Sequence, residues 1–194
     1  MGDRPYALTL ARAAFVASII IFSWLHMQWT HELGHVVAAR AGGGTVARVV
    51  LDPLTFSRTD VAPNPRPLLT VWGGPIGGVL IGAGGPLLVG VLARSLRPIC
   101  LIIAAFCLVA NGAYVGLGAV QPIADTQVMV DLGTPRWLLA LVGVASVGVG
   151  RWLIVLGIKR ARRHGLWLRP WAATLLLASG ATAMAVIGSV WFTG

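Results

Sequence analysis

The stretch Trp29-Thr30-His31-Glu32-Leu33-Gly34-His35 closes a long apolar segment that begins near Ala7. It contains the pattern H-E-x-x-H. Positions i and i+4 lie on one face of an α-helix, so His31 and His35 can bind one metal ion from the same side. Two imidazoles and a carboxylate are expensive inside a membrane, and such groups are functional by default. The stretch therefore predicts a metal site at the end of a membrane helix.

The composition places this helix in a membrane protein. Of the 194 residues, 57% are hydrophobic and only 11% are charged. A soluble domain averages about 25% charged residues, so much of this surface must face lipid. The net charge of +9 comes from basic residues that lie mainly between apolar segments, where they meet lipid headgroups. We predict one integral, multi-pass membrane domain over residues 1–194, in contact with the bilayer, and no nucleic-acid partner.

Apolar segments of about 20 residues can span a bilayer as helices. Five segments of this chain qualify, and we expect the helix of the first to continue to about Ala41. The predicted spans are Ala7–Trp29, Leu68–Leu92, Ile99–Val120, Trp137–Ile158 and Trp171–Phe192. The fold class expected is an all-α polytopic membrane protein with about five transmembrane helices.

The segment between the first two spans has a different character. Residues 45–51 are rich in β-branched side chains, Asp52-Pro53 is typical of a turn, and Leu54–Thr59 can form a second strand. Lipid does not tolerate an open sheet edge. We therefore expect a small β hairpin at the membrane interface or against protein.

The metal expected at the histidine pair is zinc, which binds imidazole nitrogen at about 2.0–2.1 Å. Glu32 lies about 100° around the helix from His31, so it is poorly placed to bind the same ion. It can instead act as a general base on a water activated by the metal. The pattern predicts His31 and His35 as ligands and Glu32 as the catalytic base.

Catalytic zinc usually has three protein ligands, and the third must come from elsewhere. His26 fits poorly, because it lies about 140° from His31 on the helix. Asp125 and Asp131 follow the third span, which ends on the same membrane side as the first. Asp125 is the first choice and Asp131 the reserve, while the alternative reading is two solvated loop acids.

Three segments carry a family resemblance. The H-E-L-G-H sequence is followed by Val36-Val37-Ala38-Ala39-Arg40, and Gly73-Gly74-Pro75-Ile76-Gly77-Gly78 is similar to a G-P-x-x-N segment with Gly78 in place of Asn. The stretch from Asn111 to Asp125 resembles an Asn…Pro…Asp-Gly segment, here with Thr126 after the Asp. Together they resemble the site-2 protease family of intramembrane zinc metalloproteases, over roughly residues 7–136. Residues 137–192 add helices that match nothing in that pattern.

The resemblance implies an activity and roles for individual residues. It implies that His31, His35 and the Asp bind zinc, that Glu32 is the base, and that Asn111 touches the substrate backbone. It also implies that the chain is an endopeptidase whose substrate is the unwound helix of another membrane protein. Because no sensor or peptide-binding domain is recognisable, regulatory partner proteins or the substrate's own helix stability would select substrates.

The orientation in the membrane stays open. Basic residues on the side of the N-terminus outnumber those on the motif side. The side of the N-terminus has Arg4, Arg94, Arg97, Lys159, Arg160, Arg162, Arg163 and Arg169. The motif side has Arg40, Arg48, Arg58, Arg66 and Arg136. The positive-inside rule then places the metal site on the outer side. The family resemblance implies the opposite orientation.

Two other functions compete with proteolysis. A non-proteolytic zinc-binding regulator or scaffold would hold a helix without cutting it, although His31, Glu32 and His35 are all present. A zinc transporter would need polar residues staged across the membrane, and the second and fifth spans offer almost none. If the chain is a protease, the exposed edge of the hairpin can bind substrate as an added strand.

Overall fold

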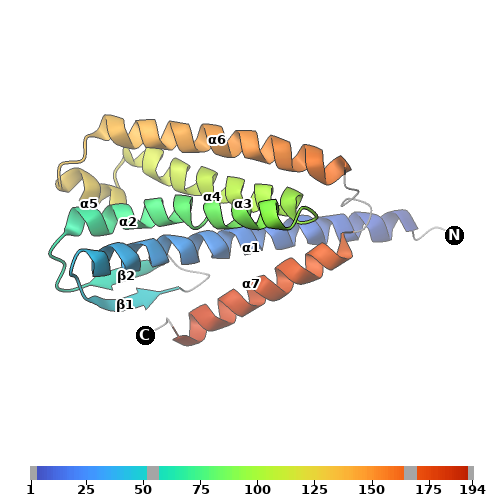
Figure 1. The fold of residues 1–194 in the computed structure, drawn as a ribbon, viewed down its shortest axis with the longest axis horizontal. Coiled ribbons are helices and arrows are strands. Elements are labelled where there is room, and N and C mark those ends of the chain that lie inside the picture. The colour runs from blue at the N-terminus through green and yellow to red at the C-terminus, as the bar shows by residue number, and fades with distance from the viewer. Residues whose placement is uncertain (1–3, 52–56, 164–169, 192–194) are drawn as a thin grey trace.

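The computed structural model describes residues 4–51, 57–163 and 170–191 (Figure 1). In chain order the elements are α1 (Arg4–Ala41), β1 (Val46–Val50), β2 (Arg58–Val61), α2 (Pro67–Leu80), α3 (Gly84–Leu92), α4 (Arg97–Gly118), α5 (Asp125–Asp131), α6 (Arg136–Arg163) and α7 (Trp171–Trp191).

Five segments of these residues are long and apolar enough to cross a membrane: Tyr6–Ala41, Pro67–Leu92, Arg97–Gly118, Arg136–Arg163 and Trp171–Val190. This confirms the predicted polytopic helical fold, including the continuation of the first helix to Ala41. The protein is thus a multi-pass membrane protein.

The second span is not one continuous helix. It consists of α2 and α3, which are separated by a turn at residues 81–83. Within that turn the carbonyl of Gly82 lies 3.0 Å from His26 Nε2 on α1. Pro86 has no N–H to donate to that carbonyl in a continuous helix, so the His26 side chain partners it instead.

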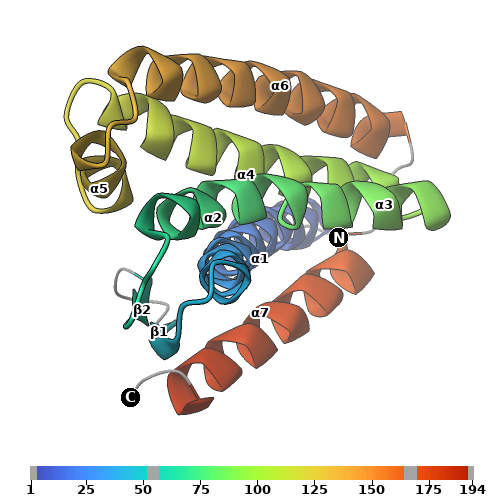
Figure 2. The same ribbon diagram turned by 60° about the vertical axis from the view of Figure 1, so that its left-hand side comes forward.

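The helices form a layered bundle around α1 (Figures 1 and 2). α4 packs along α6 on one side and reaches α1 and α2 on the other, while α7 lies against the opposite side of α1. The α1–α2 contact is very close, because a side chain at Gly34 would overlap the backbone of Gly73 and Gly77. Such contacts between small residues let helix backbones approach in membranes.

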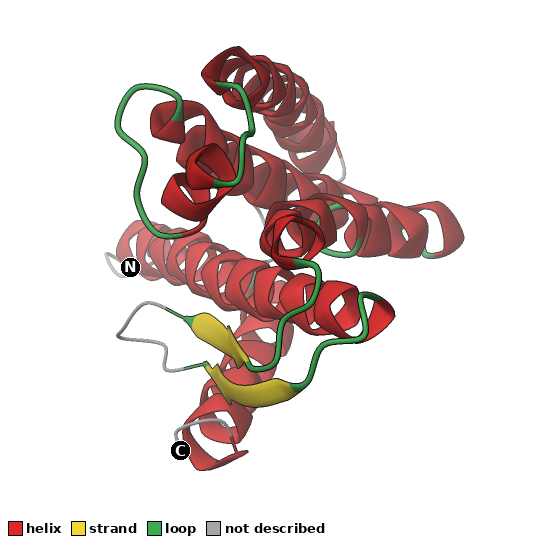
Figure 3. Cartoon of the chain, turned by 90° about the vertical axis from the view of Figure 1, so that its left-hand side faces the viewer, coloured by secondary structure: helices red, strands yellow, loops and turns green. Residues whose placement is uncertain are grey.

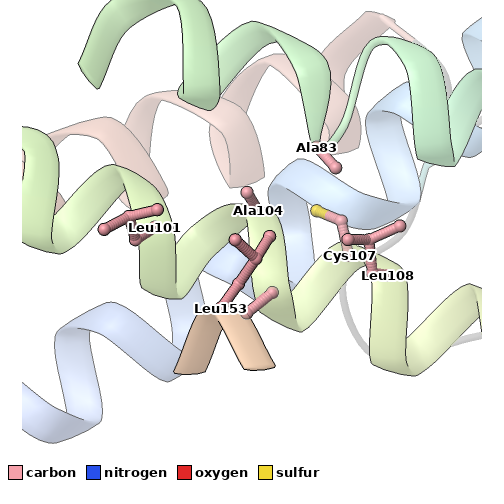
Figure 4. Close-up of a cluster of buried hydrophobic side chains, with 7 residues drawn as sticks. Ala83, Leu101, Ala104, Cys107, Leu108 and Leu153 are labelled. Carbon is pink, nitrogen blue, oxygen red and sulfur yellow. The ribbon is translucent and has the colours of Figure 1, made fainter. Parts of the chain in front are cut away.

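Part of the core lies between α3, α4 and α6. Figure 4 shows Leu101, Ala104 and Cys107 of α4 with Leu153 of α6 and Ala83, all almost fully buried. Both cysteines, Cys100 and Cys107, are free and buried. This interior holds α4 in place, and α4 carries one edge of the site described below.

The hairpin lies beside the C-terminal part of α1 (Figure 3). β1 and β2 are antiparallel, with Val49 opposite Thr59 and Val50 opposite Arg58. The predicted C-terminal end of the second strand, Thr59, was wrong, because β2 continues to Val61. Pairing with β1 sets where β2 ends, and the sequence alone does not show that pairing. The predicted turn at Asp52-Pro53 and the start of that strand fall within residues 52–56, outside the described part of the chain.

Candidate metal centre

The last turns of α1 place three polar side chains in the interior. His31, Glu32 and His35 are 9%, 2% and 6% exposed. The helix continues for six residues beyond His35, so the pair sits on regular helix and not at a frayed end. The i, i+4 spacing brings the two rings edge to face, with centroids 4.9 Å apart.

Asp125 completes a compact group with the two histidines. Its Oδ2 lies 3.1 Å from His31 Nε2 and 3.3 Å from His35 Nε2, and the two Nε2 atoms are 3.2 Å apart. Ligand atoms at roughly 2.0–2.1 Å from a tetrahedral zinc ion lie about 3.3 Å from one another. The three separations therefore match a three-ligand metal site.

The hydrogen bonds of the two Nδ1 atoms show that both Nε2 atoms are acceptors. His35 Nδ1 lies 2.8 Å from the carbonyl of Thr70, which can only accept, so Nδ1 is the donor. Asn111 donates its Nδ2 to the carbonyl of Cys107, which leaves its Oδ1 to accept from His31 Nδ1 at 2.8 Å. With Nδ1 protonated in both neutral rings, both Nε2 lone pairs and a carboxylate oxygen point at one spot. Only a cation, a proton or a metal ion, stabilises that arrangement, so the residues present fit a metal.

Asp125 reaches this spot because it is the first residue of the short helix α5. Its backbone N–H donates to the hydroxyl of Tyr114 on α4 at 2.9 Å. The Thr126 hydroxyl bonds to both the carbonyl and the N–H of Ile123, which closes the turn before the helix. Burial alone would raise the pKa of Asp125, but hydrogen bonds and positive charge from a protonated His31–His35 pair outweigh it and hold that pKa well below its ordinary value. The carboxylate is therefore ionised where the two rings meet it.

The family comparison bears on this group directly. The family model of peptidase M50B-like proteins matches residues 6–116. The chain belongs to the peptidase M50B-like family. This is a site-2 protease family, which confirms the resemblance seen in the sequence. No curated protein and no solved structure matches the chain.

The match covers only part of the site of this M50B-like chain. It includes the H-E-x-x-H motif and Asn111, and it ends before Asp125. Asp125 is therefore placed in the group by the geometry of the structure and not by the family match. Thr126, which follows Asp125 where the resembled pattern has Gly, is fully buried and packs against Gly118. Its side chain therefore helps to hold Asp125 in position.

The other candidates lie outside the group. Asp131 is exposed, at the far end of α5, and accepts a hydrogen bond from Gln127 at 2.7 Å. His26 faces Gly82 and stacks on Phe22 with ring centroids 5.9 Å apart. The structure brings together His31, His35 and Asp125 and leaves both of these residues elsewhere.

The glycine-rich segment of this M50B-like chain forms a wall of the site. A side chain at Gly74 would overlap His35 Nε2 and come within 2.6 Å of His31 Nε2. A side chain at Gly78 would overlap the amide of Asn111. The amide of Asn111 thus occupies the space beside Gly78.

Asn111 is 3% exposed, and both of its polar atoms are engaged with His31 and Cys107. In this arrangement it orients the imidazole of His31. Its predicted contact with the substrate backbone stays a prediction.

Thr59 and Tyr114 are two further residues at the site that the sequence reading did not single out. Thr59, on β2, donates its hydroxyl to Glu32 Oε2 at 2.7 Å. No local pattern marks a threonine in a strand as a partner of a distant carboxylate. Tyr114 could have been found, because it lies one helical turn after Asn111 and so shares a face with it.

Proposed function

We propose that the chain is an intramembrane zinc endopeptidase that hydrolyses peptide bonds in or near transmembrane segments of other membrane proteins. The observation that carries the proposal is the convergence of His31 Nε2, His35 Nε2 and Asp125 Oδ2 within hydrogen-bonding distance of one another. Membership of a peptidase family supports the reaction type.

In this proposal the three side chains hold zinc, and the Nδ1 bonds to Asn111 and Thr70 fix the ring orientations. Zinc supplies a Lewis acid that polarises the scissile carbonyl and brings the pKa of a coordinated water to near 7.

Glu32 moves the proton. One of its carboxylate oxygens, Oε2, accepts the hydrogen bond from Thr59, which orients the carboxylate. The carboxylate takes a proton from the attacking water. The hydroxide adds to the carbonyl carbon, and Glu32 then delivers the same proton to the nitrogen of the breaking C–N bond. The carboxylate is 2% exposed, which limits exchange of that proton with bulk water.

The surroundings of the site support this substrate class. The zinc ligands lie on and beside membrane-spanning helices, so the cleaved chain is a membrane-protein helix that unwinds locally. The hairpin lies beside the helix that carries Glu32, and each of its strands pairs only with the other among the described residues. A substrate segment that adds to this sheet as a strand would expose its amides to the site.

Proline substitutions along the edge of β1 that faces away from β2 test the strand addition, because each removes one N–H that could pair with a substrate strand. We expect lower turnover with unchanged zinc content. Unchanged turnover across the whole series would rule out this mode of binding.

The cleavage assay itself uses the purified full chain in detergent and a panel of single-span membrane substrates. Wild type is expected to cut at least one of them, and Glu32→Gln, an isosteric change, to lose about 10²–10⁴-fold in rate while retaining zinc. If wild type binds zinc but cuts none of a broad panel, the alternative of a zinc-binding regulator or scaffold replaces the protease.

A further inference from the structure

A cavity lies at the opposite end of the bundle from the histidines. It has a volume of about 300 Å³ and lies between α3, α4 and α6, with Leu87, Val91 and Leu101 on its apolar walls and Arg97 and Arg160 also lining it. Arg97 begins α4, about 21 Å along that helix from Asn111 at 1.5 Å per residue. The cavity is therefore separate from the candidate metal centre.

The two arginines are half-buried and face no acidic side chain that the structure describes. The Arg97 Nε–H donates to the carbonyl of Gly90 at 2.9 Å, which fixes the guanidinium beside the cavity. The described acids have their partners on the motif side: Glu32 with Thr59, Asp60 with Arg58, Asp125 with the histidines and Asp131 with Gln127.

Further basic side chains surround this end, which raises its positive potential. They are Arg94 after α3 and Lys159, Arg162 and Arg163 in the last turns of α6. Half-buried guanidinium groups lose hydration and gain most from an anionic partner, and arginine binds phosphate through paired N–H donors.

The level of the cavity in the membrane indicates which kind of anion it would bind. Arg97 is the first residue of one membrane span and Arg160 lies in the last turn of another, so both guanidinium groups sit at headgroup level. The C-terminal end of α6, which carries Arg160, lies on the side of the chain's N-terminus (Figure 1).

We propose that this cavity binds one anionic phospholipid. Its phosphate lies between Arg97 and Arg160, and the first part of an acyl chain lies along Leu87, Val91 and Leu101. The cavity holds about ten times the ~30 Å³ that a water molecule occupies in the liquid, so it encloses part of a lipid while the rest stays in the bilayer. Basic pockets between membrane helices are known to bind such headgroups.

Binding of fluorescent phosphatidylglycerol to the purified full chain in detergent micelles tests the proposal, with phosphatidylcholine as the neutral comparison. The double variant Arg97→Gln/Arg160→Gln is expected to weaken phosphatidylglycerol binding about thirtyfold, on the order of a factor of five for each charge-assisted hydrogen bond to the phosphate that is lost. The control Arg94→Gln/Arg163→Gln removes the same charge from two exposed positions and is expected to change binding less than twofold.

Two further arms separate a lipid from a free anion and from surface attraction. Val91→Trp keeps both arginines and fills the cavity from an exposed position, so it is expected to weaken lipid binding. Inorganic phosphate is expected not to displace the lipid. Equal binding of phosphatidylcholine, or an equal loss in the control double variant, would overturn the proposal. Displacement by phosphate together with an unchanged Val91→Trp variant would indicate a free-anion site and overturn it as well.

Discussion

The hydroxyl of Thr59 on β2 donates a hydrogen bond of 2.7 Å to Oε2 of Glu32 on α1. The same hydroxyl also lies 3.5 Å from the backbone carbonyl of Glu32. This contact joins the hairpin to the proposed general base. It makes Thr59 a positioning residue, because it acts on the reaction only through Glu32.

Thr59→Val is the first test of that role. Valine keeps the shape of threonine and removes the donor, and a hydrogen bond to a charged group contributes about 1.5–3 kcal/mol. We expect kcat to fall about 10–100-fold with little change in KM or zinc content, and Thr59→Ser to restore most of the activity. A Thr59→Ser variant as slow as Thr59→Val would show that the methyl packing matters and the hydroxyl does not.

Gly74→Ala tests the close approach of α2 to the histidines. The added Cβ would overlap His35 Nε2, so we expect zinc content to fall severalfold in the purified protein. Gly85→Ala on α3 is the matched control, since nothing lies within 4 Å of a Cβ there and alanine favours the helix. Full zinc content in Gly74→Ala, measured by elemental analysis, would contradict the described position of α2.

Asn111→Ala separates two roles for this residue. If Asn111 orients His31 through its Oδ1, its loss weakens zinc affinity about 10–100-fold, as for other partners of metal-bound histidines. Competition with a chelator of known affinity measures this change. A rise in KM with unchanged zinc affinity would instead support the predicted contact with the substrate backbone.

Much of this architecture is visible in the sequence because its causes are local. Helical periodicity places His31 and His35 on one face, and the alternation of spans places Asp125 on the same membrane side as both. The short helix α5 is not visible, because it depends on the Tyr114 hydroxyl and on the turn closed by Thr126. The end of β2 depends on pairing with β1, and the Thr59–Glu32 bond joins residues 27 positions apart. Contacts between residues far apart in the chain leave no periodic pattern in the sequence.

The most direct test of the account is the zinc content of the purified full chain, compared with that of Asp125→Ala and of Asp131→Ala. Asp125→Ala removes an oxygen that lies 3.1 and 3.3 Å from the two histidine nitrogens, whereas Asp131 bonds only to Gln127 among the described residues. We expect one zinc ion per chain in wild type and in Asp131→Ala, and loss of zinc in Asp125→Ala. A wild-type protein that holds no zinc after purification in zinc-containing buffer would contradict it.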